Sequence, residues 1–380
     1  MQIKLIEKYS NTNFFIVLLS SIILFLTYKY NLYKFPEAIN GPLMPWDGGR
    51  YLRPNNFLEI IEEQYFSSFP FYYFFVGLFK KYKLLPILPI CQFLIFHISC
   101  IYFFKVIKKN YNLIVGYICW GLLVLNPIFF KWCHAVNPLI LTISLCIISL
   151  NLILSKKNNV LISFLILIIL LKNDAKLIMN YIILNYFFFV KIYEKINKKI
   201  FIFLFLITLL IILNHFYILI QNTSSSFITF EESALGYDIL KQGASLKYFN
   251  SDVVAICDLT EMNSLKSHFC MIKNDFIYSL ELYSKRFIYG FFWISPHWSF
   301  QYQVLSKCMI IFYYLFSIFK FKENQNKLLL LSNFFAPFFL ILPYILDGNQ
   351  RFVTHAYIFI TPLAGMGFYL FFNFIMKFRN

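Results

Sequence analysis

The sequence predicts an all-α fold: a polytopic membrane helical bundle of about 10 transmembrane helices (10–11), with juxtamembrane helices on its outer face. Of the 380 residues, 59% are hydrophobic and only 14% are charged, whereas soluble domains average about 45–50% apolar residues. The apolar residues also form runs of roughly 20, the length that a helix needs to cross about 30 Å of hydrocarbon. This composition excludes a soluble enzyme, a disordered chain and a disulfide-stapled mini-protein.

Ten apolar runs are the predicted transmembrane helices. In chain order they are 13–30, 84–104, 112–130, 138–155, 159–172, 176–190, 200–220, 304–319, 328–346 and 356–376. The first run ends in Tyr28-Lys29-Tyr30 and not in a small-residue cleavage site, which predicts an anchor. The fifth and sixth runs are short and are separated by the polar string 172–176. Such a break is tolerated at membrane depth only beside water or protein.

The segment Ser67–Phe79 is apolar but only about 13 residues long, so two topologies are open. In one it crosses the membrane as an eleventh span, and in the other it lies at the outer interface as an amphipathic or re-entrant helix. The second topology puts both termini in the cytoplasm. Its inner segments hold 16 of the 34 basic residues but only 3 of the 18 acidic ones. The positive-inside rule therefore favours ten spans with both ends inside.

This topology divides the chain into three parts. They are an N-terminal transmembrane module at 1–220, which includes a first outer loop at 31–83, a long outer loop at 221–303, and C-terminal transmembrane helices at 304–380. The predicted location is the inner (cell) membrane of a bacterium, as an integral, multi-pass protein. The long loop contains Cys257 and Cys270, and an oxidising outer compartment would favour a disulfide between them.

The string Trp46-Asp47-Gly48-Gly49-Arg50-Tyr51 follows the first span and is a candidate catalytic segment. Two glycines allow a tight turn and close approach of a ligand, and the tryptophan suits the headgroup level of a membrane. The Asp47 carboxylate has two interpretations of equal standing: it takes a proton from an attacking hydroxyl, or it caps the helix that begins near Tyr51. The fork of Arg50 suits phosphate, although an arginine taken alone is often an ordinary loop charge.

Four segments in chain order resemble the GT-C glycosyltransferases, integral membrane enzymes that use polyprenyl-phosphate sugar donors. They are the acidic string 46–51, the proline-aromatic segment Phe69–Tyr73, the basic segment Leu171–Lys176 between two mid-chain spans, and Gln350–Phe352 followed by Pro362–Gly365. The resemblance is broad in order and spacing and thin in identities. It is closest to the mannosyltransferase-like members.

The resemblance implies a role for each matching residue. Asp47 would be the catalytic base, and Lys172, Arg351 and Arg50 would hold the donor phosphate. The other candidates, all for substrate contact, are Trp46, Tyr51, His134, Asn137, Asp174 and His297.

Three positions depart from the family pattern or have a simpler interpretation. Asn137 stands near the start of the fourth span, where a second acidic residue is often expected, and an amide cannot ionise. His134 would substitute as a polar partner, although a single interfacial histidine is more often a hydrogen-bonded surface group. His297 lies between Pro296 and Trp298, a string typical of an interfacial anchor as well as of acceptor binding.

The implied reaction moves a sugar from a polyprenyl-phosphate donor to a glycan, lipid or protein acceptor on the outer face. A single carboxylate without a covalent intermediate predicts inversion at the anomeric carbon, by analogy with inverting glycosidases. The reaction needs no cofactor, and a divalent cation is an open alternative. No Walker A or Gly-x-Gly-x-x-Gly string occurs, and the basic residues follow topology and not one groove, so nucleic acid is not an expected partner.

Two other classes remain as alternatives. A polysaccharide or O-antigen-type polymerase also uses lipid-linked sugars and outer arginines. A lipid or sugar transporter usually has internal repeats and polar groups at the membrane midplane, and the sequence has no repeat, with its ionisable residues at span ends.

Overall fold

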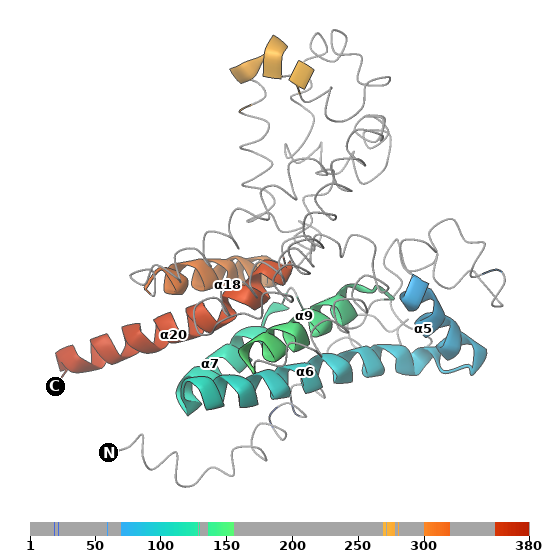
Figure 1. The fold of residues 1–380 in the computed structure, drawn as a ribbon, viewed down its shortest axis with the longest axis horizontal. Helices are drawn as coiled ribbons and strands as arrows, with labels where there is room; N and C mark the ends of the chain where they lie inside the picture. Colours follow the sequence, from blue (N-terminus) through green and yellow to red (C-terminus); the bar gives the residue numbers. More distant parts are fainter. Residues whose placement is uncertain are drawn as a thin grey trace, which may run out of the picture. The chain divides into compact units, whose positions relative to one another are not determined.

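The computed structural model describes four stretches of the chain, drawn in colour in Figure 1. They are residues 70–127, 136–155, 300–319 and 354–379, together with the isolated positions 19, 22, 59, 129, 269–270, 272–277 and 280. Every regular element in the described residues is helical, and none of these residues lies in a strand. The predicted all-α class is therefore confirmed for this part of the chain.

The first described element, α5, spans Pro70–Lys81 and turns back directly into α6 (Figure 1). Pro70 suits the first position of a helix because its missing N–H would have no partner there. The helix ends where Lys83 adopts a left-handed conformation, with φ of 56°. The Leu84 amide then donates to the Phe79 carbonyl at 2.7 Å, which is the closing bond of a Schellman cap.

A short 3₁₀ turn, η3 at Leu85–Ile87, leads into α6 at Leu88–Asn110. The next helix, α7, spans Leu113–Val124. Asn112 caps its start, because the side-chain oxygen accepts a hydrogen bond from the Val115 amide at 2.8 Å. The fourth helix of this group, α9, spans Leu139–Leu154.

The contacts of α6 define the directions of its neighbours. The Asn110 side chain donates to the Leu154 carbonyl at 3.2 Å, so the ends of α6 and α9 lie together. Leu88 and Leu141, near the starts of these helices, share one buried cluster. The rings of Phe104 and Tyr117 are 5.1 Å apart, which places the end of α6 beside the start of α7. α6 and α9 therefore run in one direction and α7 in the opposite one.

Two later helices, α18 at Phe300–Ile318 and α20 at Thr354–Arg379, pack side by side. Their ring contacts advance together along both helices: Tyr313 stacks on Tyr357 at 5.4 Å, and Phe316 meets Phe368 at 5.0 Å. The two helices are therefore parallel. The Tyr313 hydroxyl donates to a carbonyl near the end of α7, that of Leu122, at 2.7 Å. Cys119, one turn earlier in α7, donates to the Thr361 carbonyl, so α20 runs opposite to α7 and in the same direction as α6 and α9.

Two glycines allow α20 to pack closely against both neighbours. A methyl group built on Gly365 would overlap the Cys119 sulfur of α7, and one built on Gly367 would overlap the Phe316 carbonyl of α18. Residues two apart on a helix point to nearly opposite sides. The pair therefore serves two different interfaces, in the manner of small residues at helix contacts in membranes.

Two helical stretches are long and apolar enough to cross a membrane, Leu85–Asn110 and Tyr357–Lys377. At 1.5 Å per residue they measure about 39 Å and about 32 Å. Three further apolar helices are shorter: Leu113–Val124, Leu139–Leu154 and Gln303–Ile318. The predicted run 112–130 thus corresponds to a helix that ends at Val124. Pro127 explains the difference, because it lacks the amide that would bond to the Leu123 carbonyl.

The predicted spans 13–30, 159–172, 176–190, 200–220 and 328–346 lie outside the described residues, apart from helical positions at Leu19 and Ile22. Backbone contacts group the chain into two compact units. The first comprises Met1–Tyr193, Ile311–Leu329 and Tyr357–Asn380, and the second comprises Glu194–Ile310 and Leu330–Ala356. The helix pairs described above all meet through residues of the first unit.

Candidate functional site

Among the predicted site residues, Asn137 alone belongs to the described part of the chain. The other nine lie outside it: Trp46, Asp47, Arg50, Tyr51, His134, Lys172, Asp174, His297 and Arg351. The proline-aromatic segment is described from Pro70, and Pro362–Gly365 lies within α20. The site is therefore built here from the elements that carry Asn137 and these segments.

Asn137 lies immediately before α9 and is buried, with 7% of its surface exposed. Its side-chain oxygen accepts a hydrogen bond from the Leu139 amide at 2.9 Å. That amide is one of the four at a helix start that have no partner inside the helix. The residue thus has a local structural function at the start of α9, which the sequence analysis did not identify.

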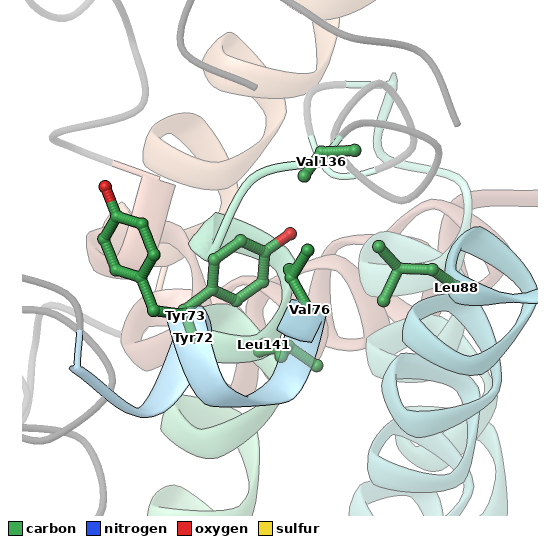
Figure 2. Packing of buried hydrophobic residues seen from close by; sticks show 6 residues of the cluster. All are labelled: Tyr72, Tyr73, Val76, Leu88, Val136 and Leu141. Carbon is green, nitrogen blue, oxygen red and sulfur yellow. The ribbon is translucent and has the colours of Figure 1, made fainter. Parts of the chain in front are cut away.

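A buried cluster includes Val136, the residue before Asn137, and joins three helices (Figure 2). It comprises Tyr72, Tyr73 and Val76 of α5, Leu88 at the start of α6, Val136 in the segment before α9, and Leu141 of α9. Each of these side chains is at most 5% exposed. The cluster brings the proline-aromatic segment into contact with the segment that ends in Asn137, although the two are more than 60 residues apart in the sequence.

A buried hydrogen bond fixes α5 against α6 at the same place. The Tyr72 hydroxyl donates to the side-chain oxygen of Gln92 at 2.9 Å, and both side chains are fully buried. Because a polar group in an apolar interior is costly without a partner, this bond specifies the angle at which α5 meets α6. It also orients the aromatic segment relative to the start of α9.

A second polar cluster, formed by α7, α18 and α20, was not predicted from the sequence. Its centre is Tyr313, whose hydroxyl donates to the Leu122 carbonyl and also lies within hydrogen-bonding reach of the Asn126 and Thr361 side chains. Thr361 in turn donates to the Tyr357 carbonyl at 2.6 Å. All the side chains of this cluster are fully buried. It has no access to a substrate in this structure and serves to hold three helices together.

His97 is another polar side chain that the sequence analysis did not single out. It lies in the middle of α6, 4% exposed, against the ring of Phe93 at 4.2 Å between centroids. Within the described part of the chain, neither ring nitrogen has a hydrogen-bond partner. A histidine at this depth is unusual, but one such side chain does not make a site.

The lysines divide into two groups at opposite ends of α6. Lys80, Lys81 and Lys83 precede its start, and Lys105, Lys108 and Lys109 lie along its last two turns. Of these six, only Lys80 is partly buried, and the other five are exposed. α6 thus separates two positively charged ends.

The described residues contain no group of three or more His, Cys, Asp or Glu side chains that could hold a metal ion. Cys270 is disulfide-bonded, and Cys257, its predicted partner, lies outside the described residues. The free cysteines of the described residues are buried at positions 100, 119 and 146, partly buried at 91 and exposed at 308.

Three comparisons with known proteins give no assignment. No family model, no curated protein and no solved structure matches this chain. Any function therefore has to be argued from the residues themselves and from the helices that carry them.

Proposed function

We propose that this chain is an integral membrane glycosyltransferase of the GT-C type. It moves a sugar from a polyprenyl-phosphate donor to a glycan, lipid or protein acceptor at the outer face of a bacterial inner membrane. Asp47 is its catalytic base, and Lys172, Arg351 and Arg50 hold the donor phosphate.

Support for membrane insertion comes from the distribution of side chains around the described helices. On α6, the aliphatic side chains of Leu94, Ile95 and Ile98 are exposed, whereas Gln92 and Ser99 are buried. α9 is buried on nearly all sides, and its buried residues include four polar ones, Thr142, Ser144, Ser149 and Asn151. Apolar side chains outward and polar ones inward suit a lipid solvent, because an exposed aliphatic stripe of this kind is unfavourable in water.

Support for the topology comes from the helix directions. The proposed ten-span arrangement requires the runs 84–104, 138–155, 304–319 and 356–376 to cross in one direction and 112–130 to cross in the other. The helices α6, α9, α18 and α20 are parallel to one another and α7 is antiparallel to them. Lys108 and Lys109 then lie at the same end as Lys377 of α20, as expected for a cytoplasmic face with both chain termini.

The observation that carries the site is the cluster in Figure 2, which places Tyr72 and Tyr73 of α5 in one buried group with Val136. It brings the proline-aromatic segment of the resemblance together with the segment that holds the proposed substrate contact Asn137. The proposed substrate contact His134 precedes α9 by a few residues in the sequence and is therefore expected near this end of the helix. A site at this end would therefore collect residues from remote parts of the sequence.

The chemistry follows from the donor. The bond between the anomeric carbon and the phosphate oxygen breaks, and the phosphate leaves with the electron pair. The acceptor hydroxyl forms the new bond from the opposite face and gives its proton to Asp47, which inverts the anomeric centre. Cationic side chains in a site of low dielectric stabilise the departing phosphate, usually the largest catalytic contribution. A positioned base typically adds about 10²–10⁴ in rate.

Analysis of cell-envelope glycans tests this function. In the organism that carries the gene, deletion should remove one sugar from a glycan, lipid or protein, and the wild-type gene should restore it. Single repeat units without long chains would instead identify a polymerase. An unchanged set of envelope glycans, with a change in the uptake or export of a lipid or sugar, would refute the transferase and favour a transporter.

A further inference from the structure

The two lysine groups at the ends of α6 create a conflict with the positive-inside rule. Lys80, Lys81 and Lys83 precede α6, and Lys108 and Lys109 lie in its last turn. The helical stretch Leu85–Asn110 is long enough to cross a membrane. If it does so, one group of lysines lies on the non-cytoplasmic face, whichever way the helix is oriented. The positive-inside rule does not explain the lysines of that group, so their presence requires another explanation.

The helix α5 does not remove the conflict. Its 12 residues measure about 18 Å, well short of about 30 Å of hydrocarbon. Its start lies beside Gln92, one turn inside α6, through the Tyr72 hydrogen bond. Its end and the following turn therefore form a tip at the start of α6, which we define as residues 78–87.

The tip combines exposed apolar groups with positive charge. Leu78, Tyr82, Leu84 and Ile87 are 55%, 63%, 42% and 43% exposed. Lys81 and Lys83 are also exposed, and the Lys81 ammonium lies over the Tyr82 ring, 5.7 Å from its centroid. An aromatic ring with basic and aliphatic neighbours is typical of a surface that enters the headgroup layer of a membrane.

The backbone conformation of Lys83 indicates that the positive charge at the tip has a function. Lys83 has a φ of 56°, and this left-handed position after a helix is normally taken by glycine. For an L-residue with a side chain this conformation is unfavourable, because the Cβ atom comes too close to the following carbonyl oxygen. A lysine at this turn is therefore disfavoured by the backbone, and a favourable interaction of its ammonium group with a ligand would offset that cost.

We propose that the tip of residues 78–87 is a docking surface for anionic phospholipid. Lys81 and Lys83, supported by Lys80, bind the headgroup phosphate, while Tyr82 and the aliphatic side chains enter the acyl boundary. Charge complementarity selects this partner, since an anionic phospholipid has a net negative headgroup, whereas a zwitterionic phospholipid is neutral. The inference rests on the proposed membrane insertion of α6 and does not depend on the transferase reaction.

Photocrosslinking from the tip tests the proposal directly. The full-length protein, with Tyr82 replaced by p-benzoylphenylalanine, is reconstituted in vesicles of phosphatidylcholine containing one tenth phosphatidylglycerol. Captured lipid is then identified by mass spectrometry. We expect phosphatidylglycerol to be captured about fivefold or more above its share of the vesicle, as about one lysine–headgroup interaction predicts. High salt should reduce this enrichment.

The variant Lys80→Gln, Lys81→Gln, Lys83→Gln should capture the two lipids in proportion to their shares, with the same total yield. The matched control is Lys105→Gln, Lys108→Gln, Lys109→Gln, which removes the same charge from the other end of α6 and should keep the enrichment. The proposal is overturned if the wild-type protein captures the two lipids in proportion to their shares of the vesicle. It is also overturned if both variants lose the phosphatidylglycerol enrichment equally. Displacement by millimolar inorganic phosphate would also overturn it, because it would indicate a site for the free ion.

The outcome separates this inference from the proposed function. Asp47→Asn should abolish sugar transfer and keep the phosphatidylglycerol enrichment. If the wild-type protein enriches phosphatidylglycerol but transfers no sugar, the proposed enzyme activity is refuted and the proposed lipid-docking surface is not.

Discussion

Four glycines, two in α7 and two in α20, provide a graded test of how α20 is packed. A methyl group added to Gly121 meets nothing within 4 Å, so Gly121→Ala should stabilise α7 by up to about 1 kcal/mol through helix propensity. A methyl group on Gly116 would lie 3.1 Å from the Phe104 ring, which can shift by a few tenths of an ångström. A methyl group on Gly367 would overlap the Phe316 carbonyl, and a backbone group of a neighbouring helix cannot rotate away.

The expected stabilities follow from these contacts. Overpacking of this kind costs typically about 1–3 kcal/mol. The free energy of unfolding should therefore fall in the order Gly121→Ala, Gly116→Ala, Gly367→Ala, with about 1–3 kcal/mol between the first and the last. The assay is unfolding in mixed dodecyl maltoside and sodium dodecyl sulfate micelles, followed by tryptophan fluorescence. Equal stability of Gly121→Ala and Gly367→Ala would refute the proposed contact between α18 and α20.

Gly365 allows a sharper version of the same test. Its added methyl group would overlap the Cys119 sulfur and not the backbone. Gly365→Ala should therefore destabilise the protein, and Cys119→Ala in the same chain should recover most of the loss. The coupling between the two substitutions is expected in the range of about 0.5–3 kcal/mol for residues in contact. Strictly additive effects would contradict the packing of α20 against α7.

Three further outcomes are expected. Tyr313→Phe removes the hydroxyl that donates to the Leu122 carbonyl and should lower the free energy of unfolding by about 0.6–2 kcal/mol in the same assay. An unchanged free energy of unfolding would show that the polar cluster of α7, α18 and α20 does not stabilise the protein. Asn112→Ala removes the acceptor of the Val115 amide and should cost about 0.5–2 kcal/mol, whereas Asn112→Ser should cost much less; equal losses would argue against a cap. Alkaline phosphatase fused after Asn110 should be inactive in a bacterial host, because that end of α6 is proposed to be cytoplasmic. The same enzyme fused between α7 and α9 should be active, and the reverse pattern would show that the helices cross the membrane in the opposite direction.

The helices were predictable from the sequence where the apolar run is long, because a run of about 20 apolar residues is itself the signal of a membrane-spanning helix. The predicted runs 84–104 and 356–376 correspond to α6 and α20, and 138–155 corresponds closely to α9. Their ends were less predictable. α6 continues to Asn110, since lysines in the last turn of a helix are compatible with its dipole. α20 continues through Pro362, because membrane helices tolerate a proline where neighbouring helices and local adjustments satisfy the freed backbone carbonyl.

The interior polar groups were not predictable because their partners are remote in the sequence. Tyr313 bonds to a carbonyl 191 residues away, and Cys119 bonds to one 242 residues away. Neither spacing leaves a pattern that periodicity can detect. Asn137 was recognised as an unusual residue at the start of a span, but its bond to the Leu139 amide is a local capping interaction that competes with the assigned substrate contact. The positions of Asp47, Lys172 and Arg351 stay predictions from sequence and resemblance.

Sugar transfer by the purified protein tests the central proposal most directly. The full-length chain is incubated in detergent with a panel of polyprenyl-phosphate hexoses and a panel of glycan, lipid and peptide acceptors. Release of polyprenyl phosphate is measured for the wild type, for Asp47→Asn and for the control Glu59→Gln, which removes another carboxylate of the first outer loop. The proposal predicts release by the wild type and the control, inversion of the anomeric centre in the product, and a loss of about 10² or more in Asp47→Asn with unchanged membrane insertion. Full activity of Asp47→Asn would contradict it.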